Sequence, residues 1–251
     1  MAYLHGKFMW FEHFSGDVPK ARAFYSALFG WMTDPVAMGA GRYALIQNAG
    51  EGIGGFRTAQ PGERSLWMSY LSVADVDAAS KSAEAAGATV LMPPTDFPSV
   101  GRGATLADPT GAVFCVWKGT QEDPPDAEPV PPGAWYWNEC WTPERDAALT
   151  FYEKAFGFTH ETMTSIQGPY RVLMKDGIAR AGIMQATQPG PPAAWLPYVS
   201  VADCDATVKR AADLGAHIGL PPTDVPEVGR IAVFMDTSGA MIGIIKGRFT
   251  G

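Results

Sequence analysis

Two glutamates, Glu12 and Glu139, have the surroundings in this sequence that are best suited to chemistry. Each lies within a short run of apolar and aromatic residues, FMWFEHF and WYWNECW, that is typical of a buried strand. A carboxylate in such a place is costly unless it is paired. Burial also raises its pKa, so either glutamate could act catalytically as a proton acceptor or could anchor a ligand.

A structural role is the alternative for both glutamates. Arg102 and Arg230 stand at equivalent positions at the start of a later predicted strand, and each could form an ion pair with one of the buried carboxylates. Such ion pairs would explain why both apolar strands tolerate a glutamate, which favours the structural interpretation. The proton-transfer role stays open.

Other motifs with a known mechanism are missing from the sequence. It has no G-x-S-x-G, H-E-x-x-H or P-loop, and its Gly52-Ile53-Gly54-Gly55 run does not fit a dinucleotide fingerprint. The four histidines have no spacing suited to chelation, and His13 should point away from Glu12 because side chains alternate along a strand.

Most of the sequence consists of an internal repeat. The stretch from Trp67 to Gly119 recurs at a constant offset of 128 residues, and the earlier part recurs at 127, so that Tyr43 matches Tyr170. A long match at a fixed offset indicates a duplicated structural unit.

Each half of the sequence contains two modules of one strand, one helix and three strands. The first module is predicted to have a strand over 7–14, a helix over 19–29 that ends at Gly30, and strands over 31–38, 43–48 and 53–58. The second has a strand over 67–73, a helix that starts at the Asp75 cap and ends at Ala86, and strands over 89–92, 103–107 and 112–118. The Pro-Pro-Thr-Asp stretches at 93–96 and 221–224 are expected to be loops.

A proline-rich segment separates the two halves. Residues 120–133 contain five prolines and no periodicity, which is typical of an extended linker. We therefore expect an α+β protein with one domain over 7–119 and a second over 134–247.

Several motifs resemble those of the vicinal oxygen chelate superfamily, which includes glyoxalases, bleomycin-resistance proteins and extradiol dioxygenases. They are Asp17 seven residues before Phe24-Tyr25, the Phe29-Gly30 and Gly101-Arg102 pairs, and the Asp108-Pro109-Thr110-Gly111 turn. The resemblance implies curved sheets of tandem βαβββ modules with a cleft in each half.

The metal-ligand positions implied by this resemblance carry unsuitable side chains. In this sequence they are Trp10, Met68 and Cys115 in the first half, and Trp137, Leu196 and Gly243 in the second. Divalent ions of this family need carboxylate or imidazole donors, so we expect no metal and no other cofactor.

The same resemblance, together with strand alternation, predicts which side chains line the clefts. Besides the positions above, the predicted ligand-binding residues are Tyr70, Arg102, Trp117, Trp135, Tyr198 and Arg230. Because Gly243 has no side chain, the second cleft is expected to be the roomier one and the better binding site. The alternative is that these aromatic residues only fill the former metal cavity.

The overall composition favours a small-molecule partner. The net charge is −7 and the basic residues are scattered, which argues against nucleic acid or a membrane surface. Three cysteines without a metal-binding spacing and an N-terminus without a signal-peptide pattern predict a cytoplasmic protein. The tandem repeat predicts a monomer with an internal pseudo-dimer, or a homodimer. We expect metal-independent binding of an apolar or aromatic molecule. The alternative is an enzyme, either a lyase or isomerase acting on a carbonyl compound or a hydroxylase-type oxidoreductase, that uses Glu12 or Glu139.

Overall fold

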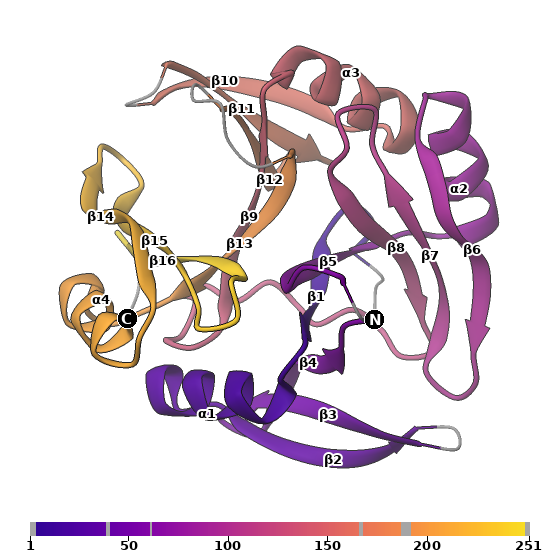
Figure 1. The fold of residues 1–251 in the computed structure, drawn as a ribbon. Coiled ribbons are helices and arrows are strands. Elements are labelled where there is room, and N and C mark those ends of the chain that lie inside the picture. Colours follow the sequence, from indigo (N-terminus) through magenta and orange to yellow (C-terminus); the bar gives the residue numbers. More distant parts are fainter. Residues whose placement is uncertain (1–3, 39–40, 61, 166–167, 187–191, 249–251) are drawn as a thin grey trace. The chain divides into compact units, whose positions relative to one another are not determined.

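The computed structural model describes residues 4–38, 41–60, 62–165, 168–186 and 192–248, and the strands and helices of these residues follow the predicted order (Figure 1). The first half contains β1 (Phe8–Ser15), α1 (Val18–Phe29), β2 (Met32–Met38), β3 (Gly41–Asn48), β4 (Glu51–Thr58), β5 (Leu66–Ser72), α2 (Val76–Ala85), β6 (Thr89–Phe97), β7 (Gly101–Ala107) and β8 (Val113–Gly119). The second half contains β9 (Trp135–Thr142), α3 (Arg145–Phe156), β10 (Thr159–Ser165), β11 (Gly168–Lys175), β12 (Ile178–Gln185), β13 (Ala194–Ser200), α4 (Cys204–Asp213), β14 (His217–Val225), β15 (Gly229–Met235) and β16 (Met241–Gly247).

The strands form two mixed sheets with the same topology. One has the order β2-β3-β4-β1-β5-β8-β7-β6, and the other has the order β10-β11-β12-β9-β13-β16-β15-β14. In both, the first strand of a module pairs in parallel with its last strand, as β1 does with β4 and β9 with β12. The α+β class and the repeated βαβββ modules are therefore confirmed.

The helix ends follow the sequence signals. Gly30 and Gly157 end α1 and α3 in the left-handed conformation, with φ values of 74° and 65°. Asp75 and Asp203 cap α2 and α4, because each side chain accepts a hydrogen bond from a backbone N–H three residues later.

The Pro-Pro-Thr-Asp stretches are not loops, so this prediction was wrong. Residues 93–96 belong to the edge strand β6 and residues 221–224 to the edge strand β14. The register shifts between Met92 and Thr95, and between Leu220 and Thr223, so neither proline pair occupies a paired position. Irregular edge strands are where a sheet tolerates proline.

By contacts, the described chain divides into two compact units that interleave the modules. Unit 1 consists of Met1–Trp10, Ser69–Asp126 and Trp137–Trp195, and unit 2 of Phe11–Met68, Ala127–Tyr136 and Leu196–Gly251. Within unit 1 α2 contacts α3, and within unit 2 α1 contacts α4. The sheets follow the two halves of the sequence and the contact units do not, so the domain boundaries expected from the repeat stay a prediction.

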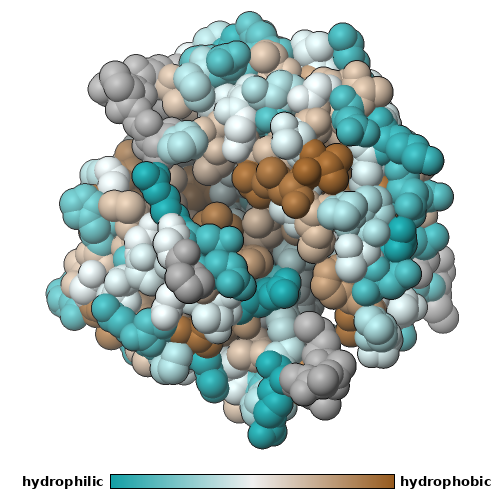
Figure 2. Space-filling view, turned by 45° about the vertical axis from the view of Figure 1, so that its right-hand side comes forward, coloured by the Kyte–Doolittle hydropathy of each residue, from teal (hydrophilic) through white to brown (hydrophobic). Residues whose placement is uncertain are grey.

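The exposed hydrophobic side chains are scattered. On the face that Figure 2 shows, hydrophobic residues form small patches between hydrophilic ones. The most exposed large apolar side chains, Met32, Leu91 and Ile178, come from three different strands. Isolated residues of this kind are normal on a protein surface. None of the described helices is both long and apolar enough to span a membrane.

Candidate functional site

Glu12 lies buried on β1 and accepts a hydrogen bond from a tyrosine two strands away. The Tyr43 hydroxyl on β3 donates to Glu12 Oε1 over 2.6 Å. Gly55 lies between them on β4, directly opposite Glu12 in the register. A Cβ at Gly55 would lie 1.9 Å from the tyrosine hydroxyl oxygen, so only glycine lets Tyr43 reach the glutamate.

A cation also lies beside Glu12. Arg57, two residues after Gly55 on β4, places its guanidinium 3.5 Å from Glu12 Oε2. The same guanidinium lies 5.6 Å from the centre of the Phe14 ring, which is the register partner of Arg57 on β1. The Arg57 side chain is 43% exposed whereas that of Glu12 is 8% exposed, so the pair is open to water on one side only.

Glu139 repeats the tyrosine and glycine arrangement on β9. The Tyr170 hydroxyl on β11 donates to Glu139 Oε2 over 3.3 Å. It crosses Gly182 on β12, where a Cβ would lie 1.6 Å from the hydroxyl oxygen. The Trp137 indole N–H donates in turn to the Tyr170 oxygen over 2.8 Å.

The second oxygen of Glu139 has a neutral donor in place of a cation. The Trp141 indole N–H donates to Glu139 Oε1 over 2.6 Å. Burial raises the pKa of Glu139 to about 7, although the hydrogen bonds from Trp141 and Tyr170 act to lower it. Within the described residues no ion pair involves Glu139, and the position that matches Arg57 is Met184.

The two arginines expected beside the glutamates lie elsewhere, so the predicted pairing was wrong. Arg102 binds Asp77 and Asp96, and Arg230 binds Asp205 and Asp224. In each case one aspartate is in the first turn of a helix and the other is the register partner of the arginine on an edge strand. The sequence placed Arg102 and Arg230 at equivalent positions but could not show that each arginine binds two aspartates in place of a glutamate.

Three predicted cleft residues of the first half lie together. Cys115 is opposite Tyr70 in the register of β5 and β8, and the Tyr70 and Trp117 rings are 5.9 Å apart. Cys115 is buried, with its sulfur 3.3 Å from the Thr105 hydroxyl. Met68 is buried as well, and Trp10 is half-buried.

In the second half the structure does not show the space expected at Gly243. A Cβ there would lie 2.4 Å from the Tyr198 ring, so this tyrosine occupies the room that the glycine leaves. Leu196 is a core residue. The Trp135 indole N–H donates to the Ile53 carbonyl over 2.8 Å, and its ring packs on Phe11. Of the predicted aromatic residues, Trp137 is the one that the structure connects to Glu139.

The side chains at the family's metal-ligand positions do not form a donor set. Trp10, Met68, Trp137, Leu196 and Gly243 offer no carboxylate or imidazole, and the buried Cys115 contacts a hydroxyl group. Among the described residues no three His, Cys, Asp or Glu side chains lie close enough to hold a metal ion.

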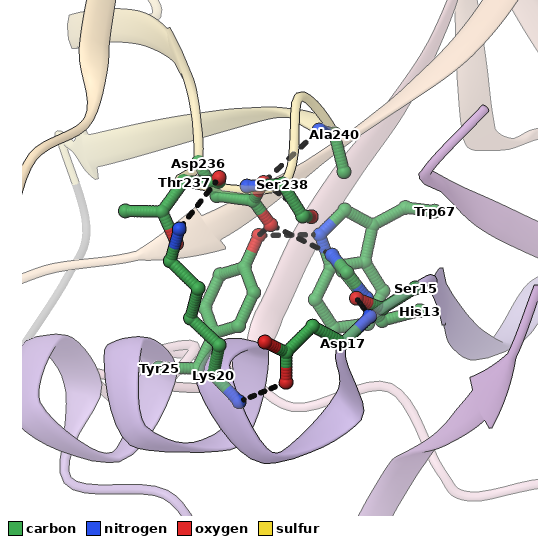
Figure 3. Close-up of polar contacts among 10 residues, drawn as sticks. All are labelled: His13, Ser15, Asp17, Lys20, Tyr25, Trp67, Asp236, Thr237, Ser238 and Ala240. Atoms are coloured by element: carbon green, nitrogen blue, oxygen red, sulfur yellow. Dashed lines mark hydrogen bonds and ion pairs between the residues drawn. The ribbon is translucent and has the colours of Figure 1, made fainter.

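A second buried network, drawn in Figure 3, joins α1 to the turn before β16 in unit 2. His13 Nε2 lies 2.7 Å from Asp236 Oδ2, and the Tyr25 hydroxyl donates to the same oxygen over 2.9 Å. The Trp67 indole N–H donates to the Tyr25 oxygen. Burial alone would raise the pKa of Asp236, but His13 and the Ser238 donors lower it to about 2.

Unit 1 contains the matching network without the histidine. The Tyr152 hydroxyl donates to Asp108 Oδ2 over 3.0 Å, and the Trp195 indole N–H donates to Tyr152. Cys140 stands where the first half has His13, and burial with the charge of Asp108 raises its thiol pKa. These networks are buried, so they hold the modules together and are not accessible to a ligand.

The sequence analysis did not assign Tyr43, Tyr170, Arg57 or Trp141 to the site. The match between Tyr43 and Tyr170 was a usable signal. The tyrosine, a glycine and the glutamate all repeat at the same offset, which suggests that the three are in contact in both halves. Arg57 and Trp141 were harder to find, since their roles depend on the register between strands.

One open pocket of about 410 Å³, in unit 2, has neither glutamate in its lining. It is lined by residues of α1 and the start of β2, among them Arg22, Trp31 and Asp34. The Arg22 guanidinium there donates a hydrogen bond to the carbonyl of Thr33, which also lines the pocket.

Comparison with known families and proteins agrees with the fold and with the repeat. Residues 13–117 match the model of the glyoxalase-like domain, and residues 139–244 match that of the glyoxalase, bleomycin resistance protein and dioxygenase superfamily. The chain belongs to this superfamily, with two family domains in tandem, as the resemblance implied.

Two relatives are similar along almost the whole chain. A protein of Mycobacterium tuberculosis named "Putative glyoxylase CFP32" is 36% identical, with 97% of this chain and 96% of the relative covered. The anthracycline biosynthesis protein DnrV of Streptomyces peucetius is 32% identical, with 94% and 92% covered.

Solved structures share the fold at lower identity. The Mn(II)-bound glyoxalase from Novosphingobium aromaticivorans is 20% identical with a TM-score of 0.65, over 96% of this chain and 82% of that one. The 2,3-dioxygenase LapB from Pseudomonas sp. KL28 is 13% identical, also with a TM-score of 0.65, over 98% and 93%. These structures support the architecture and leave the activity open.

Proposed function

We propose that this protein binds a small, largely apolar or aromatic organic molecule without a metal ion, at a site built around Glu139. The observation that carries the proposal is the surroundings of this buried carboxyl group. Its oxygens accept hydrogen bonds from Trp141 and Tyr170, and no cation among the described residues forms an ion pair with it.

The site has the composition of a small-molecule site. Trp137, Trp141 and Tyr170 are half-buried, whereas the carboxyl group between them is buried. Aromatic faces with one placed polar group give a ligand both contact area and orientation. A planar molecule can stack on the accessible part of these half-buried rings while one polar atom reaches the glutamate.

The names of the relatives are consistent with this class of ligand. One is named as a glyoxylase and another as an anthracycline biosynthesis protein, and both names point to small organic molecules. The metal-independent mode rests on the side chains at the ligand positions of this sequence, since none of the six supplies a carboxylate or imidazole.

A second function, favoured by the pKa of Glu139, is proton transfer. A general base works best when its pKa lies near the working pH, and burial raises that of Glu139 to about 7. Glu139 would then remove a proton next to a carbonyl group, as a lyase or isomerase requires, while Tyr170 and Trp141 hold the carboxylate in place.

Two measurements test these functions. Calorimetry with 4-methylphenol should show binding to the parent and a loss of at least about tenfold in Trp137→Leu, because a ring face is removed. Elemental analysis of the bound sample should find no stoichiometric metal. Absence of any aromatic binding, or binding that requires a metal, would contradict the proposal.

Proton transfer is tested by deuterium exchange of the methyl protons of acetophenone in D₂O, followed by NMR. The parent should exchange them and Glu139→Gln should not, whereas Glu12→Gln should retain the activity. Equal rates in parent and Glu139→Gln would exclude Glu139 as the base.

A further inference from the structure

The surroundings of Glu12 and Glu139 differ by an exchange of residues at two neighbouring positions. At Glu12 the adjacent strand positions carry Phe14 and Arg57, and at Glu139 the matching positions carry Trp141 and Met184. We propose that this exchange sets the ligand chemistry of the two halves, and that Trp141 with Met184 makes the Glu139 site specific for a neutral phenolic or enolic hydroxyl group. The inference rests on the proposed function.

The geometry shows that the exchange is reciprocal. Phe14 and Arg57 are register partners, as are Trp141 and Met184, so the two residues of each pair lie side by side on neighbouring strands. In the first half the strand β4 supplies the donor to the glutamate and β1 supplies an apolar ring. In the second half β9 supplies the donor and β12 an apolar side chain. Besides its tyrosine, each glutamate therefore has one further donor, which is charged in the first half (Arg57) and neutral in the second (Trp141).

The difference in charge decides which ligand group each carboxyl can accept. The Arg57 guanidinium compensates the charge of Glu12, so that carboxylate is already engaged in an ion pair. The donors to Glu139 are an indole and a phenol, which satisfy its oxygens without compensating its charge. A ligand that brings its own hydroxyl proton would stabilise the Glu139 carboxylate.

Groups that face Glu139 from the packed elements agree with this preference. Tyr170 comes from β11, and Gly182 and Met184 come from β12. Arg180, farther along β12, is bound to Asp126. A ligand carboxylate would meet a second negative charge here and no described cation, so it should be excluded.

The test uses three matched probes that share a methylphenyl ring: 4-methylphenol, 4-methoxytoluene and 4-methylbenzoate. Calorimetry at pH 7 compares the parent with the double variant Trp141→Phe/Met184→Arg. The parent should prefer the phenol over the ether by at least about tenfold, since only the phenol donates a hydrogen bond, and should not bind the benzoate. The double variant should lose the preference for the phenol.

The reciprocal double variant Phe14→Trp/Arg57→Met in the first half is the control, and it should leave binding at Glu139 unchanged. Circular dichroism and thermal unfolding show whether each variant is folded. The single variants Trp141→Phe and Met184→Arg replace the double one if it does not fold.

The outcomes separate this inference from the proposed function. If the parent binds none of the three probes, the proposed function fails and the inference fails with it. If the parent binds the aromatic probes but does not distinguish phenol from ether, or if the variants keep the parent's preference, the inference is overturned while the proposed function stands.

Discussion

Glu12 and Glu139 occupy matching positions on β1 and β9, and the contrast between them shows which parts of the repeat are fixed. Both accept a hydrogen bond from a tyrosine that crosses a glycine on the intervening strand. The remaining donor differs, because Arg57 is charged and the Trp141 indole is neutral. The backbone thus preserves the reach of the tyrosine, while the charge of the site varies between the halves.

The buried aspartates show the same contrast in the core. Asp236 and Asp108 each accept a tyrosine hydroxyl on one oxygen and the donors of their own turn on the other. Asp236 also binds His13, whose place is taken by Cys140 in the second half. One copy of the network therefore contains a buried histidine partner that the other lacks.

The largest effect is expected from removing the aspartate of the pair. Asp236→Ala leaves His13 and Tyr25 buried without their acceptor, and should lower the free energy of unfolding by about 3–5 kcal/mol. Asp108→Ala loses hydrogen bonds alone and should cost about 1–3 kcal/mol. Urea unfolding at pH 7 measures both values, and equal costs would mean that His13 adds nothing to the network.

The pH dependence of the Asp236 contribution has a defined sign. Its pKa is lowered from 3.8 to about 2 in the folded protein, so its stabilising effect is present above pH 3.8 and is lost as the pH falls towards 2.

Glu139 should show the opposite behaviour, with the next largest effect. Its folded pKa is raised from 4.5 to about 7, so its ionisation destabilises the fold as the pH rises through this range. Between pH 5 and pH 8, Glu139→Gln should gain about 2–3 kcal/mol of unfolding free energy relative to the parent. The measurement is denaturant unfolding at both pH values.

Glu12→Gln is the matched variant for that experiment. It removes the charge that Arg57 binds, so it should destabilise the protein at pH 8, where Glu139→Gln gains most. A pH-independent difference between Glu139→Gln and the parent would show that the surroundings of Glu139 do not disfavour its ionised form.

A smaller loss is expected from the glycines under the tyrosines. Gly182→Ala places a Cβ 1.6 Å from the Tyr170 hydroxyl position and should cost about 1–3 kcal/mol while displacing the tyrosine from Glu139. Gly219→Ala, on the edge strand β14, is the control, because its Cβ would lie 3.6 Å from the nearest atom, the carbonyl oxygen of Val233 on β15. Thermal unfolding should separate the two, and equal melting temperatures would mean that the contact can relax.

The smallest effect should come from the arginines that sequence analysis placed beside the glutamates. Arg102 and Arg230 bind exposed aspartates, and exposed ion pairs contribute little. Arg102→Ala and Arg230→Ala should therefore change the melting temperature less than the substitutions above, and by the same amount in both halves. A large loss in either would restore a structural role for that arginine.

The repeat made the fold predictable. An offset match across both halves, helix caps such as Asp75 and helix ends such as Gly30 located the modules, because these signals depend on local backbone conformation. The Pro-Pro-Thr-Asp strands were missed because local turn preference was overridden by pairing at a sheet edge.

The candidate site was predictable only in part. Glu139 and Trp137 were identified from alternation along one strand, which sequence shows directly. Tyr170, Trp141 and Met184 depend on which strands are neighbours and in which register, and Gly243 depends on where the Tyr198 ring lies. These are tertiary contacts without a local signal.

The most direct test of the account is the ionisation of Glu139 itself. Carboxyl carbon NMR of the protein labelled at glutamate, assigned by comparison with Glu139→Gln, should show this group titrating near pH 7 in the parent and at a clearly lower pH in Met184→Arg. A Glu139 that titrates near 4.5 in the parent, or at the same pH in both proteins, would contradict the claim that the second half holds a carboxyl group without a compensating charge.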